Sequence, residues 1–174
     1  MSIKETTNSS VIPGTSVSNR PKILIAEDSP TQAEQLKFML EKKTFSTKGT
    51  PKISLDPDGI IKIRGRSMSG NVTEFFKQIE DWVDEYICDP ADLTCIDIYL
   101  EYVNTNDLKI YISLLKKITS IRLKNKKYII NWYYEKGDED ILEKGEYISS
   151  VLDIPFNFIK ICDPLMLEFD PLEW

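Results

Sequence analysis

Hydrophobic and polar residues alternate along residues 93–103, which is the pattern of a β-strand with one face in the core. One side of this segment is apolar and the other mostly polar: Ile96, Ile98, Leu100 and Tyr102 against Cys95, Asp97, Tyr99 and Glu101. Residues 60–66 repeat the pattern, with Ile61 and Ile63 opposite Lys62, Arg64 and Arg66. A sheet buried on both faces would instead show continuous apolar runs. The sequence therefore predicts a sheet with one apolar and one polar face.

Three segments have apolar residues at helical spacing and alternate with the predicted strands. The predicted helices span residues 71–88, 107–124 and 138–152, and the predicted strands span 52–55, 60–66, 93–103, 128–134 and 156–161, with a hairpin turn at 56–59. Helical crossovers between neighbouring strands give a partly parallel sheet. We expect a two-layer α/β domain of order ββαβαβαβ, with a mixed five-stranded sheet and helices mainly on one face. The polar face is then solvated, covered by the N-terminal helix, or used by a partner.

The chain divides into four predicted segments. Residues 1–20 are rich in Ser, Thr and Asn and predict a disordered arm. Residues 21–48 hold a short strand followed by a helix over Thr31–Lys43. Residues 49–161 form the main domain. Residues 162–174 form a C-terminal tail whose apolar side chains are available for docking on the body: Leu165, Leu167, Phe169 and Trp174.

Composition excludes several classes of function. The net charge of −6 argues against a nucleic-acid binder, which needs a basic face. The sequence has no histidine, which removes His-based catalysis and common zinc sites, and its cysteines show no CxxC spacing: Cys88, Cys95 and Cys162. We therefore expect no catalytic residues, no metal site and no cofactor. The first twenty residues lack an apolar core and no run approaches a membrane span, so we predict a cytoplasmic protein with no membrane insertion.

The junction between residues 93–103 and the next helix is the strongest functional candidate. It reads Asn104-Thr105-Asn106-Asp107, with a hydroxyl and two amides where the strand runs into the helix. Asn104 or Thr105 can serve as an ordinary helix cap. A phosphate on Thr105 would meet backbone N–H groups at the positive end of the helix dipole. Capping and phosphorylation use the same N–H groups, so both interpretations stay open.

Residues 100–105, Leu-Glu-Tyr-Val-Asn-Thr, resemble the L-E-Y-F-N-T segment of the SiaC-type regulatory phosphoproteins. Further blocks resemble the family in the same order: residues 49–51 with 55–57, residues 63–67, residues 131–135 with 138–140, and the closing segment 152–157. The resemblance covers about residues 49–161. The sequence departs from the family at Asn106-Asp107, where serines are common, and this bears on kinase recognition.

The resemblance implies a non-enzymatic phospho-switch in a partner-switching pathway. A Ser/Thr kinase with a histidine-kinase-like ATPase fold would phosphorylate Thr105, and a PP2C-type phosphatase would reverse the modification. The unphosphorylated form would bind and activate an effector such as a diguanylate cyclase, raising cyclic di-GMP. Thr105 is the phosphorylation site that the resemblance implies.

Six further residues are candidates for partner binding: Arg64, Arg66, Ser67, Asn104, Asn106 and Tyr133. Arg64 or Arg66 could bind the phosphate on Thr105 or the carboxylates of a partner. Alternatively, both arginines are solvated or paired with acids of the neighbouring strand. Tyr133 lies in a run of three aromatic residues that point to alternating faces, so at least one faces away from the helices. Core packing accounts for most of them, and an exposed one would suit an interface.

Residues 22–43 resemble the first strand and helix of a response-regulator receiver domain. In that family an acid pair after the strand helps bind magnesium, and Glu27 and Asp28 are the matching positions. The remaining receiver elements are missing, so the fragment is interpreted as a remnant or an accessory element. The alternative function is a two-component receiver-like signalling adaptor phosphorylated on an acidic residue.

Overall fold

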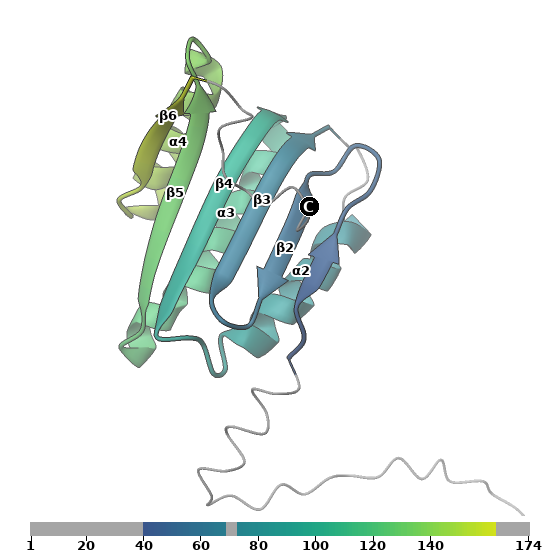
Figure 1. The fold of residues 1–174 in the computed structure, drawn as a ribbon, viewed down its shortest axis with the longest axis vertical. Helices are drawn as coiled ribbons and strands as arrows, with labels where there is room; N and C mark the ends of the chain where they lie inside the picture. Colours follow the sequence, from purple (N-terminus) through teal and green to yellow (C-terminus); the bar gives the residue numbers. More distant parts are fainter. Residues whose placement is uncertain (1–39, 69–72, 163–174) are drawn as a thin grey trace, which may run out of the picture.

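The computed structural model describes residues 40–68 and 73–162, which form a mixed six-stranded sheet. The strands lie in chain order from one edge to the other (Figure 1): β1 Lys43–Phe45, β2 Lys52–Asp56, β3 Ile60–Ser67, β4 Leu93–Val103, β5 Lys127–Glu135 and β6 Asn157–Ile161. The first three strands pair antiparallel, and the pairs from β3 to β6 are parallel. The parallel pairs place the ends of β3, β4 and β5 at the same edge of the sheet.

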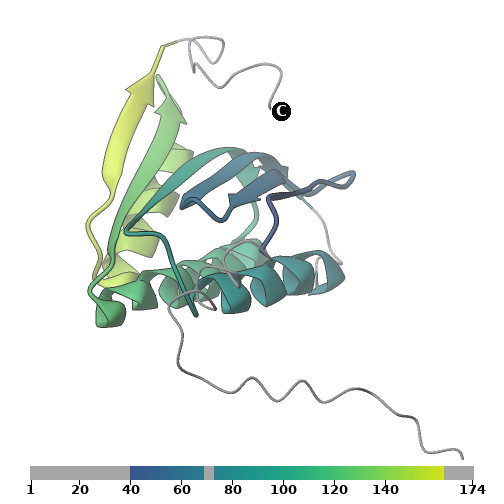
Figure 2. The same cartoon turned by 60° about the horizontal axis from the view of Figure 1, so that its bottom comes forward.

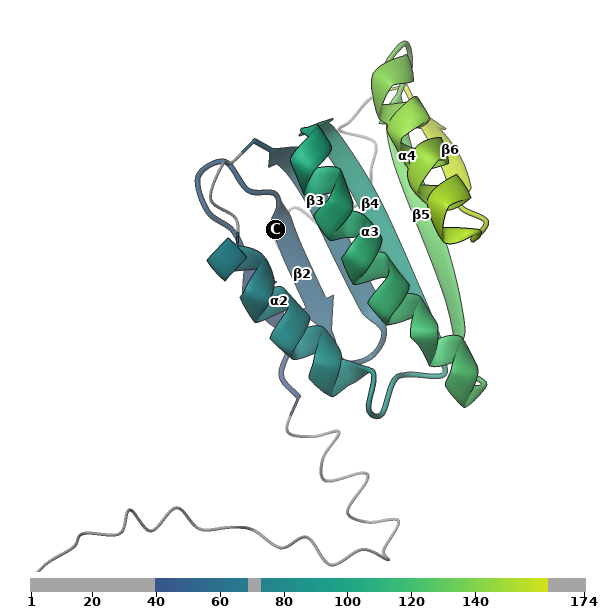
Figure 3. The ribbon, with the colours of Figure 1, turned by 180° about the vertical axis from the view of Figure 1, so that it is seen from behind.

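Each parallel pair is joined through a helix, and all of these helices cover the same face. They are α2 Thr73–Tyr86, α3 Thr105–Thr119 with the short 3₁₀ helix η1 Ser120–Lys124, and α4 Glu139–Leu152. Figure 3, seen from behind, shows the helices as one layer in front of the sheet, and Figure 2 shows the same layer from another side. Crossovers of a single hand between strands laid down in sequence place every helix on the same side. The predicted two-layer α/β fold is confirmed.

The prediction of five strands is wrong by one. Residues 43–45 form β1, which pairs with residues 53–55 of β2. The sequence pattern predicts a helix that ends at Lys43, yet residues 40–42 are not helical in the structure. A three-residue edge strand is too short to show a period-2 pattern, whereas the apolar residues before it have helical spacing. The rest of that predicted helix, Glu27, Asp28 and the C-terminal tail beyond residue 162 lie outside the described residues.

The core lies between the helices and the apolar face of the sheet. The inward residues of the strands meet the apolar stripe of each helix, and the largest fully buried side chains include Trp82, Trp132, Tyr86 and Tyr111. Trp82 Nε1 donates to the carbonyl of Glu41 at 3.0 Å, and Trp132 Nε1 donates to the carbonyl of Ile141 at 3.0 Å. Each buried indole thus keeps a partner for its polar N–H group.

A β-bulge interrupts the alternation near the end of β4. Gly65 pairs with Leu100 but Arg66 pairs with Tyr102, so Glu101 is the extra residue. Gly65 has a φ of +108°, a conformation that favours glycine. Tyr102 therefore turns outward with 39% exposure, while Val103 is 1% exposed. The prediction that Tyr102 shares the apolar face with Leu100 is wrong because of this bulge.

Helix α4 packs closely on Trp132 of β5 at Gly145. We expect Gly145→Ala to lower the free energy of unfolding by about 1–3 kcal/mol through overpacking, because its Cβ would lie 2.6 Å from Trp132 Cε2 and Nε1. In an exposed helix interior, replacing glycine by alanine usually adds about 1 kcal/mol of stability. Urea unfolding followed by tryptophan fluorescence measures the change, with the exposed neighbour Glu146→Ala as control. A higher unfolding midpoint for Gly145→Ala would contradict the close contact.

Candidate functional site

The start of α3 is fixed by Asn104, which is the N-cap of the helix. Its backbone is extended, with φ −81° and ψ 161°, and its Oδ1 accepts from the Asp107 N–H at 2.8 Å. The Leu108 N–H donates to the Asn104 carbonyl at 3.2 Å. Of the two residues considered as caps, the structure selects Asn104, which leaves the hydroxyl of Thr105 outside the capping interaction.

Thr105 is the first residue of α3 and is exposed, as is Asn106. First-turn residues carry backbone N–H groups that have no partner inside the helix. These groups, together with the helix dipole, form an environment that favours negative charge. The position therefore combines an accessible hydroxyl with a backbone arrangement that can hold a phosphate attached to it.

A buried hydrogen bond supports the junction from the helix side of the sheet. Ser67 Oγ donates to Asp107 Oδ2 at 2.5 Å, and Asp107 is 1% exposed. The Asn104 N–H donates to the Ser67 carbonyl at 3.3 Å. The hydroxyl of Tyr111 lies in the same cluster, without a hydrogen-bond partner of good geometry among the described residues, and burial raises the pKa of Tyr111. The end of β3 and the start of α3 are thus held together by both backbone and side-chain contacts.

Two cations converge on the outward ring of Tyr102. Arg66 Cζ lies 5.9 Å from the ring centroid and Lys144 Nζ lies 5.8 Å from it, and Lys144 also pairs with Asp140. Lys144 belongs to α4 on the helix side of the sheet. The β4–β5 pairing ends at Tyr99 and Tyr133, before β4 itself ends, and the two strands separate toward this edge in Figure 1. We call Arg66, Tyr102 and Lys144 the Tyr102 cluster.

The face opposite the helices carries a hydrogen-bond network around Asp97. Its Oδ1 accepts from Asn131 Nδ2 at 2.8 Å and from Tyr133 Oη at 3.4 Å. Burial and the Asp97 carboxylate raise the pKa of Tyr133 to about 12, so its hydroxyl stays protonated and donates. Two residues after Asp97 on β4, Tyr99 Oη donates to Glu135 at 2.5 Å. The guanidinium of Arg64 lies 5.5 Å from the Tyr99 ring centroid. This face is therefore structured, with polar groups joined across neighbouring strands.

Five of the predicted site residues meet at one edge of the sheet: Arg66, Ser67, Asn104, Thr105 and Asn106. Arg64 and Tyr133 lie farther along the strands, on the face opposite the helices, which we call the open face. They are neighbours of Tyr99 and not of Thr105. The side chain of Ser67 is buried against Asp107, so its predicted contact with a partner stays a prediction that this geometry does not favour.

Three residues of this edge were missed by the sequence analysis in the roles the structure gives them. The Asn104-to-Asp107 spacing is a visible capping signal, yet the burial of Asp107 is a tertiary effect. Tyr102 was assigned to the wrong face, and Lys144 comes from α4, which follows β5 in the chain and packs on the helix side of the sheet. A sequence pattern offers no signal that would bring Lys144 and Arg66 to the same ring.

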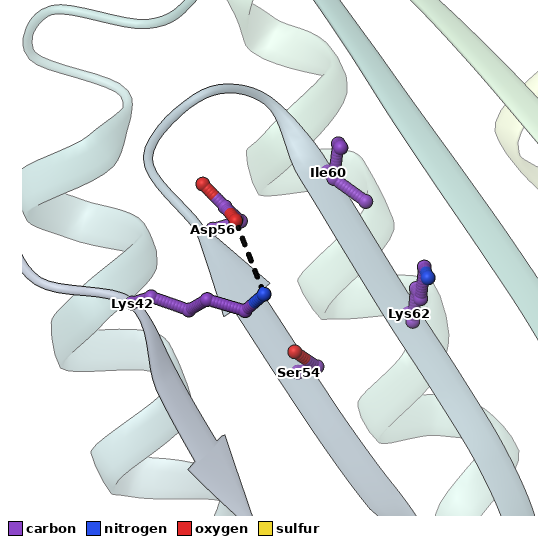
Figure 4. A pocket seen from close by; sticks show the side chains of 5 residues that line it. All are labelled: Lys42, Ser54, Asp56, Ile60 and Lys62. Atoms are coloured by element: carbon purple, nitrogen blue, oxygen red, sulfur yellow. Dashed lines mark ion pairs between the residues drawn. The ribbon is translucent and has the colours of Figure 1, made fainter. Parts of the chain in front are cut away.

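A small pocket of about 90 Å³ lies elsewhere on the sheet, beside the hairpin between β2 and β3. It is lined by Lys42, Ser54, Asp56, Ile60 and Lys62, and Lys42 pairs with Asp56 at 3.5 Å (Figure 4). The hairpin is at the opposite end of β3 from Ser67, so the pocket is separate from Thr105. Within residues 40–68 and 73–162 no His, Cys, Asp or Glu cluster is arranged to hold a metal ion. None of the helices described is long and apolar enough to cross a membrane.

The assignment of the cap can be tested on two adjacent residues. We expect Asn104→Ala to lower the free energy of unfolding by about 1 kcal/mol, because the Asp107 N–H loses its acceptor. Thr105→Ala should change stability by less than half as much, since the side chain is exposed and makes no capping contact. Urea unfolding of both variants measures the difference. A larger loss for Thr105→Ala would show that Thr105 is the cap.

Comparison with known proteins identifies the family. The model of the SiaC family regulatory phosphoproteins matches residues 44–161. An uncharacterised protein of Pseudomonas aeruginosa strain UCBPP-PA14 is 27% identical over 111 residues, which are 63% of this chain and 88% of the relative.

Solved structures agree with this match. The Pseudomonas aeruginosa diguanylate cyclase SiaD in complex with its activator SiaC contains a chain that is 25% identical, with a TM-score of 0.60 over 70% of this chain and 99% of that one. The apo-SiaC structure from the same species has 24% identity and a TM-score of 0.59, over 69% of this chain and 98% of that one. The resemblance inferred from the sequence blocks is confirmed, because the matched residues 44–161 are more than half of the 174: this chain belongs to the SiaC family of regulatory phosphoproteins.

Proposed function

We propose that this protein is a non-enzymatic phospho-switch whose modified residue is Thr105. The observation that carries the proposal is the place of this hydroxyl: exposed, at the first position of α3, and within the segment that resembles the family's Asn-Thr motif. Asn104 already caps the helix, so modification of Thr105 does not require loss of the cap. Membership of a family of regulatory phosphoproteins supports this choice.

The chemistry is a reversible phosphoryl transfer. A Ser/Thr kinase with a histidine-kinase-like ATPase fold transfers the γ-phosphoryl group of ATP to Thr105 Oγ1, which loses its proton, and ADP leaves. A PP2C-type phosphatase hydrolyses the ester with water, which restores the hydroxyl and releases inorganic phosphate. The protein supplies the acceptor and its position, and the partner enzymes supply the catalysis.

The effector we propose is a diguanylate cyclase, which the unphosphorylated form binds and activates, raising cyclic di-GMP. Support comes from the solved complex in which a SiaC chain 25% identical to this one is the activator of the cyclase SiaD. The exposed surface around Thr105 includes Arg66, Asn106 and Tyr102, and we propose it as part of the docking surface. Asn104 contributes by capping α3, which fixes the position of Thr105. Arg64 and Tyr133 extend the proposed docking surface along the open face.

Phosphorylation should weaken binding to the effector for an electrostatic reason. The modification adds about −1.5 to −2 charges at neutral pH. In this chain the charge arrives two residues before the buried carboxylate of Asp107, in a protein of net charge −6. A surface that must lose water on docking tolerates such a group poorly unless the partner offers cations. The unmodified state is therefore the binding state in this proposal.

Phosphosite mapping tests the assignment directly. We expect a phosphopeptide that carries the modification on Thr105 when the protein is isolated from its own cells with phosphatases inhibited. The ester of threonine survives acid, whereas an acyl phosphate on a carboxylate does not, so acid treatment separates the switch from a receiver-like adaptor. Complete coverage of residues 100–110 without phosphate under all growth conditions would reject the proposal.

Binding measurements test the direction of control. We expect Thr105→Ala to bind the cyclase as the wild type does and to escape kinase control, because the acceptor hydroxyl is gone. Thr105→Glu should weaken binding about tenfold or more, since a carboxylate remains at the interface. Isothermal titration with the purified cyclase gives both values, and the exposed Ser113→Glu on the same helix is the charge control. Equal weakening by Thr105→Glu and Ser113→Glu would mean that overall charge, and not position 105, sets the affinity.

A further inference from the structure

The Tyr102 cluster brings together cations from two separate layers of the molecule. Arg66 is on β3 and Lys144 is on α4, yet their charged atoms lie 5.9 and 5.8 Å from the centroid of one ring. Arg66 is exposed, and Tyr102 is 39% exposed. The cluster therefore places two cations beside one exposed ring at the surface of an acidic protein, with the carboxylate of Asp140 paired to Lys144.

The backbone connects this cluster closely to Thr105. Arg66 pairs with Tyr102, the next pair is Ser67 with Val103, and the Asn104 N–H donates to the Ser67 carbonyl. Thr105 follows Tyr102 by three residues, a span of at most about 11 Å for an extended chain. Neighbouring strands lie about 4.8 Å apart. The Asn104–Ser67 hydrogen bond gives a shorter path, because Arg66 directly precedes Ser67 and Thr105 directly follows Asn104. A long arginine side chain and a phosphate ester on Thr105 can therefore approach each other.

In the unmodified protein both cations lie near the ring of Tyr102, and a phosphate would attract them more strongly than the ring does. An aromatic ring attracts a cation through its quadrupole, which is weaker than a full opposite charge. A phosphate offers that charge and can accept two parallel hydrogen bonds from a guanidinium. Lys144 also pairs with Asp140 one turn earlier on α4, and the Asp140 side chain is 69% exposed, so water competes for its carboxylate and weakens this ion pair.

We infer that Arg66 and Lys144 are the phosphate-binding residues of the switch, which leave the ring of Tyr102 for the phosphate once Thr105 is modified. This inference rests on the proposed function, in which Thr105 is the acceptor. It also gives the modification a structural consequence: the cations that lie over Tyr102 in the unmodified protein become engaged by the phosphate. The same two cations are then withdrawn from an effector that presents carboxylates.

The titration of the phosphate itself tests the inference. Cations nearby stabilise the dianion and lower the second pKa of phosphothreonine, which is about 6 in the absence of partners. Lys109, which is exposed on α3, and the helix dipole also lower it, while Asp107, Glu101 and Asp140 raise it. Because these groups are common to all variants, differences between variants isolate the contributions of Arg66 and Lys144.

The experiment uses full-length protein with phosphothreonine installed at position 105 by genetic code expansion, followed by ³¹P NMR across pH. We expect Arg66→Gln and Lys144→Gln each to raise the phosphate pKa by about 0.5–1 unit relative to the unsubstituted chain. Arg66→Lys, which keeps the charge, should restore part of the shift. The matched control is Arg64→Gln, which removes an arginine from the same strand and face that lies over Tyr99.

The outcomes separate this inference from the proposed function. If the phosphate pKa is the same in all variants, or if Arg64→Gln raises it as much as Arg66→Gln, the inference is wrong. Circular dichroism and urea unfolding confirm that each variant is folded, so a purely structural role for the cluster would change stability without moving the phosphate pKa. Because the phosphate is installed during synthesis, the result does not depend on a cellular kinase, whereas absence of phosphate on Thr105 in cells would reject only the proposed function.

Discussion

The parallel pairing of β3 with β4, including its bulge, is the constraint on which the candidate site depends. It pairs Ser67 with Val103, so the Ser67 carbonyl meets the Asn104 N–H and the Ser67 hydroxyl meets Asp107. These contacts fix where β4 stops and α3 starts, and they leave the hydroxyl of Thr105 at the surface. The same bulge turns Tyr102 toward Arg66. One extra residue in a strand thus sets both the backbone and the charge environment of the site.

The distribution of charge differs between the whole chain and this edge of the sheet. The protein carries a net charge of −6, while Arg66 and Lys144 gather over one aromatic ring beside α3. A net negative charge disfavours broad binding of polyanions, and two cations beside one ring can act only at short range. The face around Asp97 adds a second polar surface, whose side chains are joined by hydrogen bonds across neighbouring strands. Together they offer a partner a polar surface beside the end of β4, where the proposed phosphate on Thr105 would add negative charge.

The sequence predicted the layered fold because its strands alternate apolar and polar residues while its helices carry wide apolar stripes. It missed β1, since residues 43–45 are too few to show a period. It put Tyr102 on the wrong face, since a bulge cannot be read from alternation alone. For the site, the resemblance implies Thr105 as the phosphate acceptor, which stays a prediction. Capping chemistry left Asn104 and Thr105 as candidates for the N-cap, and the structure shows Asn104. The contact between Lys144 and Tyr102 could not be predicted from the sequence, because only tertiary packing brings α4 to the end of β4.

Gly145 affects the position of Lys144 as well as the packing of α4. With no side chain, it lets α4 settle against the face of Trp132, where even a Cβ would lie 2.6 Å from the indole. Lys144 is the adjacent residue, so the depth at which the helix seats also sets how far its ammonium reaches toward Tyr102. A larger side chain at position 145 would therefore change the distance between the Lys144 ammonium and the Tyr102 ring. Packing between α4 and β5 thus affects where a positive charge lies at the end of β4.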